Sequence, residues 1–94
     1  MIDDTATLLR DDGTRQNISP KNGKAFEFVG EAYDLIGTDM IQLITTHDGR
    51  VLLVDEDGKR KDKPVNAAAT ALYVYGAHDH VVGHAIHCRF DQVS

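Results

Sequence analysis

This chain of 94 residues has one cysteine, two prolines, no tryptophan, and no apolar run close to the length of a membrane-spanning helix. The single cysteine, Cys88, excludes a disulfide bond within the chain, and a domain of this length does not require one to fold. A membrane helix needs about 20 mostly apolar residues, so we expect no membrane span. The opening residues MIDDTATLLRDDG are acidic where an export signal is basic, and we therefore expect a cytoplasmic protein.

Positive charge is also scarce. The chain has 15 Asp and Glu residues against 10 Lys and Arg residues, which gives a formal net charge of −5. This balance argues against a general nucleic-acid binder, because contacts to a phosphate backbone need a strongly basic surface. The apolar fraction of 41% is ordinary for a globular chain, and we find neither a repeat nor a linker. We expect a single domain over residues 1–94, with an N-terminal hairpin (1–18) and a second region (19–94).

Three Asp-Gly pairs predict turns: Asp12-Gly13, Asp48-Gly49 and Asp57-Gly58. Tight hairpin turns need positive φ angles, which Gly adopts freely and Asp tolerates, so such a pair between two β-prone runs predicts a hairpin. The first pair joins ATLLR to TRQNI, and the second joins MIQLITT to RVLLVD. The run Val51–Val54 is entirely apolar and predicts a central strand covered on both faces, which the third Asp-Gly pair ends.

Two short helices are expected between and after the hairpins. The first has the i, i+3, i+4, i+7 spacing of one helical face in Val29, Ala32, Tyr33 and Ile36. Gly37 follows at the position of a left-handed C-terminal cap. Gly30 lies inside this helix and weakens it, because glycine has low helix propensity.

The second helix is predicted to begin after Pro64-Val65, with Asn66 as the N-cap, NAAATALYVY as the body and Gly76 at the end. Residues 80–90 are rich in Val, Ile and Phe and predict a last strand. The element order is therefore ββαββαβ. We predict an α+β domain in which two short helices cover a largely antiparallel sheet.

The stretch HDHVVGHAIHC, residues 78–88, contains four of the five histidines and the only cysteine. On a strand, residues i and i+4 lie about 13 Å apart, so His80 and His84 cannot bind one metal ion. His78 and His80 are two residues apart and could both face one side, which leaves them as an alternative metal site. The favoured interpretation is partly solvated strand and turn histidines with no bound metal, and Cys88 as a buried small apolar residue.

The segment KRKDK, residues 59–63, concentrates positive charge next to the predicted start of the second helix. Helix N-termini present free N–H groups and partial positive charge, so Lys61 and Lys63 with the amides from Asn66 onward would form a phosphate pocket. The alternative is a solvated loop whose cations offset the acids of DEDG just before it. The predicted anion- or partner-binding residues are the loop cations and the N-cap: Lys59, Arg60, Lys61, Lys63 and Asn66.

Several segments together resemble a family of short proteins, catalogued as a domain of unknown function, from bacteriophages, plasmids and bacterial genomes. The segments are ISPKNGKAF, IGTDMIQLI, DGRVLLVDEDGK, KPVNAAATALY and DHVVGHAI, and they span most of the chain beyond Ile18. The resemblance implies an accessory protein of a mobile element, acting in a bacterial host cell. It implies no activity that can be assigned to a residue, and His80, His84 and His87 depart from the family pattern.

No nucleophile, paired carboxylates or cofactor motif can be recognised from spacing. We therefore expect a non-enzymatic accessory or inhibitor-like binding protein without a cofactor. Its partner would be a host or viral protein, bound through a sheet edge or the basic loop. The first alternative is a protein that sequesters a small anionic ligand of nucleotide type. The second is a metal-dependent hydrolase that uses the C-terminal histidines. A homo-oligomer is compatible with each of these.

Overall fold

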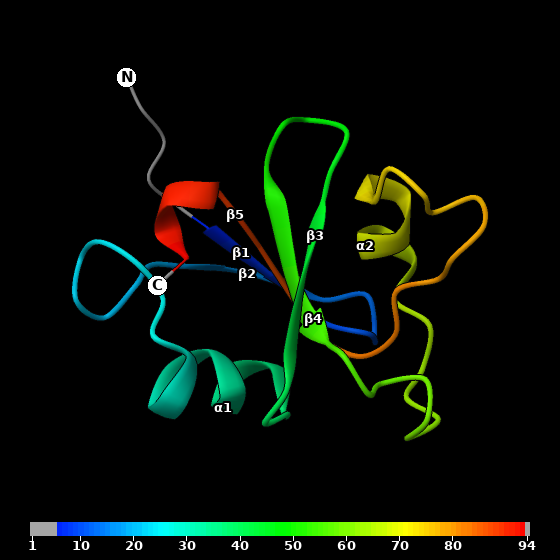
Figure 1. Cartoon of the computed structure of the whole chain (residues 1–94), viewed down its shortest axis with the longest axis horizontal. Coiled ribbons are helices and arrows are strands. Elements are labelled where there is room, and N and C mark those ends of the chain that lie inside the picture. Colours follow the sequence, from blue (N-terminus) through cyan, green and yellow to red (C-terminus); the bar gives the residue numbers. More distant parts are fainter. Residues whose placement is uncertain (1–5, 94) are drawn as a thin grey trace.

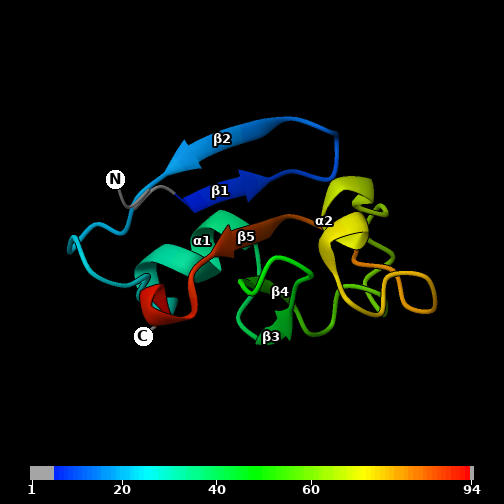
Figure 2. The same ribbon diagram turned by 90° about the horizontal axis from the view of Figure 1, so that it is seen from above.

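The computed structural model describes residues 6–93 and contains one five-stranded antiparallel sheet in the order β2-β1-β5-β4-β3 (Figure 1). The strands are β1 (Ala6–Leu9), β2 (Arg15–Ile18), β3 (Ile41–Thr45), β4 (Val51–Asp55) and β5 (Ala85–Cys88). The helical segments are η1 (Phe28–Ala32), α1 (Tyr33–Ile36), α2 (Ala67–Leu72) and η2 (Phe90–Gln92). Apart from the short turns η1 and η2, the order is the predicted ββαββαβ, so the α+β fold is confirmed. β2 and β3 form the two edges of the sheet (Figure 2).

Two of the Asp-Gly pairs close hairpins as predicted. Gly13 and Gly49 have φ angles of 91° and 80°, the left-handed conformation that these turns require. The amide of Thr46 donates to the carbonyl of Arg50 at 3.1 Å and closes the β3–β4 hairpin. The third pair ends β4, because the N–H of Gly58 turns back to the carbonyl of Asp55 at 3.2 Å.

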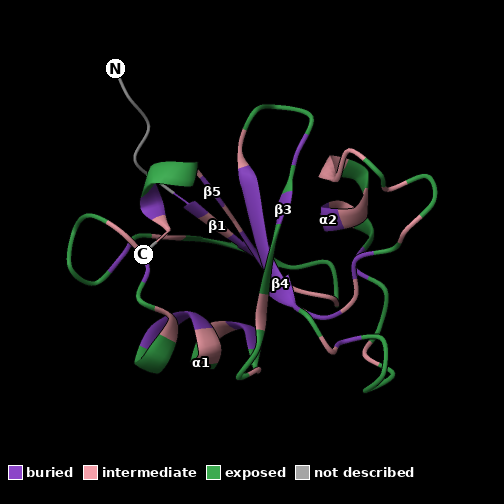
Figure 3. Ribbon diagram, viewed as in Figure 1, coloured by how far each residue is buried: buried purple, intermediate pink, exposed green. Residues whose placement is uncertain are grey.

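Apolar side chains cover both faces of the sheet in two separate clusters. The cluster on the α1 side contains Ala6, Leu8, Phe26, Ala32, Ile36, Val51, Leu53, Ile86 and Cys88. The cluster on the α2 side contains Leu9, Ile44, Leu52, Val54, Ala69, Val81 and Ala85. All five residues of β4 are buried (Figure 3). Val51 and Leu53 belong to the cluster on the α1 side, and Leu52 and Val54 belong to the cluster on the α2 side. The prediction of a central strand covered on both faces is confirmed.

The first helix is shorter than predicted. Val29 and Gly30 have non-helical backbone angles, with φ of 81° at Gly30, and the side chain of Val29 is 77% exposed. The prediction that Val29 lies on the buried helix face is therefore wrong, because the glycine beside it breaks the helix. The end of the helix is as predicted: Gly37 is left-handed, and its N–H donates to the carbonyl of Tyr33 at 2.8 Å.

The second helix and the last strand are also shorter than predicted. α2 begins at the Asn66 cap but ends at Leu72, because the next residues pair with the end of β3 instead. The amide of His47 donates to the carbonyl of Leu72 at 2.9 Å. The last strand is limited to β5, and a left-handed Gly83 with φ of 75° precedes it. His80 and His84 therefore lie outside the strand.

Candidate functional site

The first two cations of the predicted basic loop, Lys59 and Arg60, each contact a carboxylate. The ammonium of Lys59 forms an ion pair with Asp79, twenty residues further along the chain. Arg60 Nη2 lies 3.0 Å from Asp57 Oδ2. Both cations are largely exposed, with side chains 60% and 79% accessible, so these pairs contribute little to stability. An anionic ligand at this surface would compete with acids that already occupy its cations.

The last two cations of the loop, Lys61 and Lys63, share one buried carboxylate. Lys61 Nζ and Lys63 Nζ lie 3.0 and 2.7 Å from Asp55 Oδ2, whose side chain is fully buried. Asp55 Oδ1 accepts from Thr38 Oγ1 and from the amide of Asp57, both at 2.9 Å. Burial alone would raise the pKa of Asp55, but the two ammonium groups and two donors outweigh it and hold the pKa far below 3.8. These lysines tie the loop to the end of β4.

Asn66 is brought into the core and not to the surface beside the loop cations. The side chain is 1% exposed, and its Oδ1 accepts from the amide of Ala69 at 3.1 Å, as an N-cap does. Its Nδ2 donates to the carbonyls of Leu9 and Gly83, both at 2.9 Å. Every polar atom of this side chain is used within the fold, so it joins α2 to β1 and to the segment before β5.

His78 and His80 lie in the turn region after α2 and are exposed. Among residues 6–93, no group of three or more His, Cys, Asp or Glu side chains gathers closely enough to hold a metal ion. The structure thus brings no third ligand to this pair within the described part of the chain. The predicted alternative metal site consists of two exposed imidazoles.

The remaining histidines of the C-terminal stretch have separate partners. His84 Nδ1 accepts from the amide of Asp11 at 3.2 Å. His87 Nε2 lies 3.0 Å from Asp48 Oδ2, without the alignment of a hydrogen bond. Cys88 is fully buried, and burial raises the pKa of its thiol to about 11, so it is an inert apolar residue at neutral pH.

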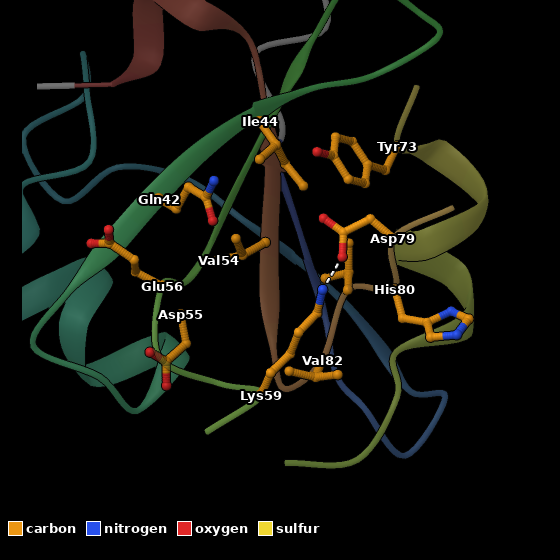
Figure 4. A pocket seen from close by; sticks show the side chains of 11 residues that line it. Gln42, Ile44, Val54, Asp55, Glu56, Lys59, Tyr73, Asp79, His80 and Val82 are labelled. Carbon is orange, nitrogen blue, oxygen red and sulfur yellow. Dashed lines mark hydrogen bonds and ion pairs between the residues drawn. The ribbon is translucent and has the colours of Figure 1, made fainter. Parts of the chain in front are cut away.

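Two of the cavities among the described residues lie beside the sheet, one on each face. One, of about 120 Å³, lies on the α2 side between Gln42 and Ile44 of β3 and the side chain of Tyr73, and the Lys59–Asp79 ion pair lies inside it (Figure 4). Cavities for small ligands measure roughly 300–1,000 Å³, so this one has room for a single side chain. The other, of about 390 Å³, lies between β2 and α1. Its buried wall residue Glu31 accepts from two backbone amides at 2.8 and 2.9 Å, so that carboxylate stabilises the fold.

The outer edge of β3 has backbone groups that are not used within the described chain. The amide of Glu56 donates to the carbonyl of Met40 at 2.9 Å, so the backbone groups of even-numbered residues point to β4 and those of odd-numbered residues point away. At Thr45 the outward carbonyl accepts from Val74 at 3.2 Å, because residues 72–74 run beside that end. Within residues 6–93, no hydrogen bond reaches the outward groups of Ile41 or Leu43.

The side chains of this edge are apolar and accessible. Met40 and Leu43 are 44% and 41% exposed, and β3, with the sequence IQLIT, contains no charged residue. β3 lies nearest the viewer in Figure 1, with α2 to one side of it. Sequence reasoning named a sheet edge as a binding surface but could not identify the strand, because strand order does not follow from local patterns.

Comparison of the chain with protein-family models, with curated proteins and with solved structures finds no match. The resemblance to a family of mobile-element proteins therefore stays a prediction. None of the helices formed by residues 6–93 has the length and apolar character needed to cross a membrane.

Proposed function

We propose that the protein is a non-enzymatic binding protein that recognises an extended segment of a partner protein by strand addition to the outer edge of β3. One observation carries the proposal: Ile41 and Leu43 present outward N–H and C=O groups beside exposed apolar side chains on an uncharged strand. In strand addition, backbone hydrogen bonds provide affinity and alternate side chains provide specificity. The sequence resemblance favours a host or viral protein as the partner.

The edge is suited to this role because the bound segment would meet a rigid template. β3 pairs along its whole length with β4, which is buried on both faces. A preformed edge binds at lower entropic cost than one that must order on binding. The basic loop contributes less to this proposal, because each of its cations contacts a carboxylate.

The test is selection of short peptides from a displayed library, followed by titration calorimetry with the wild type and with Leu43→Pro. Proline removes the outward N–H of Leu43 but no β3–β4 hydrogen bond, so the hairpin is retained. We expect Leu43→Pro to weaken peptide binding at least about tenfold, because the peptide loses the hydrogen bond from the Leu43 N–H and the adjacent hydrogen bonds are weakened.

The matched control is Asn17→Pro, which removes an outward N–H from β2 at the opposite edge. We expect this variant to bind the selected peptides as the wild type does. Leu43→Lys keeps the backbone donor but adds a charge to the edge, and it covers the case in which Leu43→Pro fails to fold. Equal peptide affinity of the wild type and the folded Leu43 variants would rule the proposal out.

A further inference from the structure

The outward N–H and C=O groups of β3 are arranged so that they can pair with the same groups of a second copy of β3. A strand that adds antiparallel to β3 must present its own free N–H and C=O groups opposite those of Ile41 and Leu43. β3 of a second copy meets this condition when a two-fold axis passes through Gln42. Ile41 then lies opposite Leu43 of the second copy, and Leu43 lies opposite Ile41 of the second copy. Each of these pairs forms two hydrogen bonds.

This register also matches the side chains on both faces. On the α1 side it places Ile41 against Leu43 of the second copy, twice. On the α2 side it places the exposed Met40 beside Ile44 of the second copy, twice. Ile44 is 8% exposed within its own cluster, so the α1-side pairs provide most of the apolar contact, and the two Gln42 side chains meet at the axis. Apolar cross-strand pairs of this kind stabilise antiparallel sheets, and no charged residue of β3 faces another.

A neighbouring register fits less well. An axis through Leu43 would place Ile41 opposite Thr45 of the second copy. The outward carbonyl of Thr45 already accepts from Val74, and residues 72–74 cover the edge beyond it. The register centred on Gln42 forms its hydrogen bonds only with the free groups of Ile41 and Leu43. Asp39, which this register places opposite Thr45 of the second copy, precedes β3 and is not required to pair there.

We infer that a second copy of this chain pairs along β3, antiparallel and centred on Gln42, to form a ten-stranded sheet from two five-stranded ones. The inference rests on the proposed function in that both use the outer edge of β3, and a partner segment must displace the second copy to bind. The net charge of −5 on each chain opposes association, so the dimer is weak and is strengthened by added salt.

The first experiment is disulfide trapping with Gln42→Cys under mild oxidation. Residues that face each other at a non-hydrogen-bonded antiparallel position have Cα atoms about 4.5 Å apart, within the range of a disulfide. The native Cys88 is buried and does not interfere. We expect rapid formation of a covalent dimer with Gln42→Cys and not with the matched control Asn17→Cys on β2. Equal trapping of the two variants, or trapping of neither, would overturn the inference.

The second experiment introduces a charge at the two-fold axis and measures association by analytical ultracentrifugation. Gln42→Lys and Gln42→Glu each face their own charge across the axis, so each variant alone should dimerise at least about tenfold more weakly than the wild type. An equimolar mixture should recover the association, because unlike charges then meet. A mixture no tighter than either variant alone contradicts this register.

The outcomes separate the two proposals. A wild-type chain that stays monomeric at every concentration and salt level overturns the inference, and peptide binding at β3 then remains as the proposed function. If the chain forms a Gln42-centred dimer but the displayed library yields no peptide whose affinity depends on Leu43, the inference is supported and the proposed function is ruled out.

Discussion

The two edges of the sheet differ in chemistry although their backbones are alike. β2 is a four-residue strand, RQNI, in which Arg15, Gln16 and Asn17 are exposed and polar. β3 is a five-residue strand, IQLIT, without a charge and with an apolar side chain accessible at Leu43. Both strands have outward N–H and C=O groups at alternate positions.

Natural sheets protect their edges with charged side chains, proline, short strands or covering segments. β2 has three polar residues, including the cation of Arg15, along its length. Within the described part of the chain, residues 72–74 cover β3 at its C-terminal end, and no backbone hydrogen bond reaches the outward groups of Ile41 or Leu43. The edge of β2 therefore has the protection expected of an edge that faces water, and the weaker protection of β3 is in keeping with the proposal that this edge receives another strand.

The largest expected effect is a loss of stability on substitution of Asp55, whose carboxylate is hydrogen-bonded to the segment that begins β3. Asp55 accepts from Thr38 Oγ1, which in turn accepts from the amide of Met40 at 3.0 Å. Asp55→Asn leaves two lysines without their buried partner, and we expect the free energy of unfolding to fall by about 3 kcal/mol. Urea denaturation measures this. Asp57→Asn, which removes the exposed pair with Arg60, should cost less than about 1 kcal/mol. Similar losses in both variants would contradict the role assigned to Asp55.

The same carboxylate should make the stability of the β3 end sensitive to acid. Its pKa is lowered from 3.8, so the folded state binds this proton less readily than the unfolded state. The stability advantage of the wild type over Asp55→Asn is then complete above about pH 4 and decreases as the pH falls through the lowered pKa. Denaturation over a pH series tests this. A difference that stays constant down to about pH 2 contradicts it.

Replacing the polar residues of β2 with apolar ones should give its edge the capacity for self-association that we propose for β3. Arg15→Val with Asn17→Val replaces its outward-bonding polar residues with β-branched apolar ones, and we expect new self-association through that edge. Ultracentrifugation of this variant in the Gln42→Lys background separates the new contact from that of β3. Arg15→Lys with Asn17→Thr, which keeps the edge polar, should behave as the parent does. A monomeric double-valine variant would mean that edge polarity does not control association here.

The smallest effect is a shift in amide exchange rates. In dilute protein the outward amides of Ile41 and Leu43 should exchange faster than the inward amides of Gln42 and Ile44. At high concentration the outward pair should become protected, whereas Arg15 and Asn17 of β2 should not. Hydrogen exchange followed by NMR gives these rates residue by residue. Equal protection of the two edges would remove the distinction between them.

Features that depend on neighbouring residues were predictable from the sequence. Gly49 in its hairpin turn, Gly37 at the helix end and Asn66 as the N-cap all appear as predicted, because one residue and its immediate neighbours decide each of them. The burial of β4 followed from its unbroken apolar run.

Features that depend on contacts between distant residues were not predictable. Lys59 reaches Asp79, and Lys63 Nζ donates to the carbonyl of Gly37, twenty-six residues earlier, at 3.0 Å. No local pattern indicates that the basic loop finds acids in this way. The early end of α2 has a similar cause, since Tyr73 pairs with Thr46 of the β3–β4 hairpin instead of continuing the helix.

The burial of β4 between two apolar clusters has a consequence for how the edge behaves in time. β3 is joined to β4 by five residue pairs and adds Ile44 to the α2-side cluster, so its detachment would break these pairs and expose the buried apolar side chains of β4. Opening of the edge strand should therefore be costly and rare. On a chain that is not paired with a second copy, an incoming strand would meet an edge that is already formed, and its rate of capture would be governed by encounter with the edge and not by a conformational change.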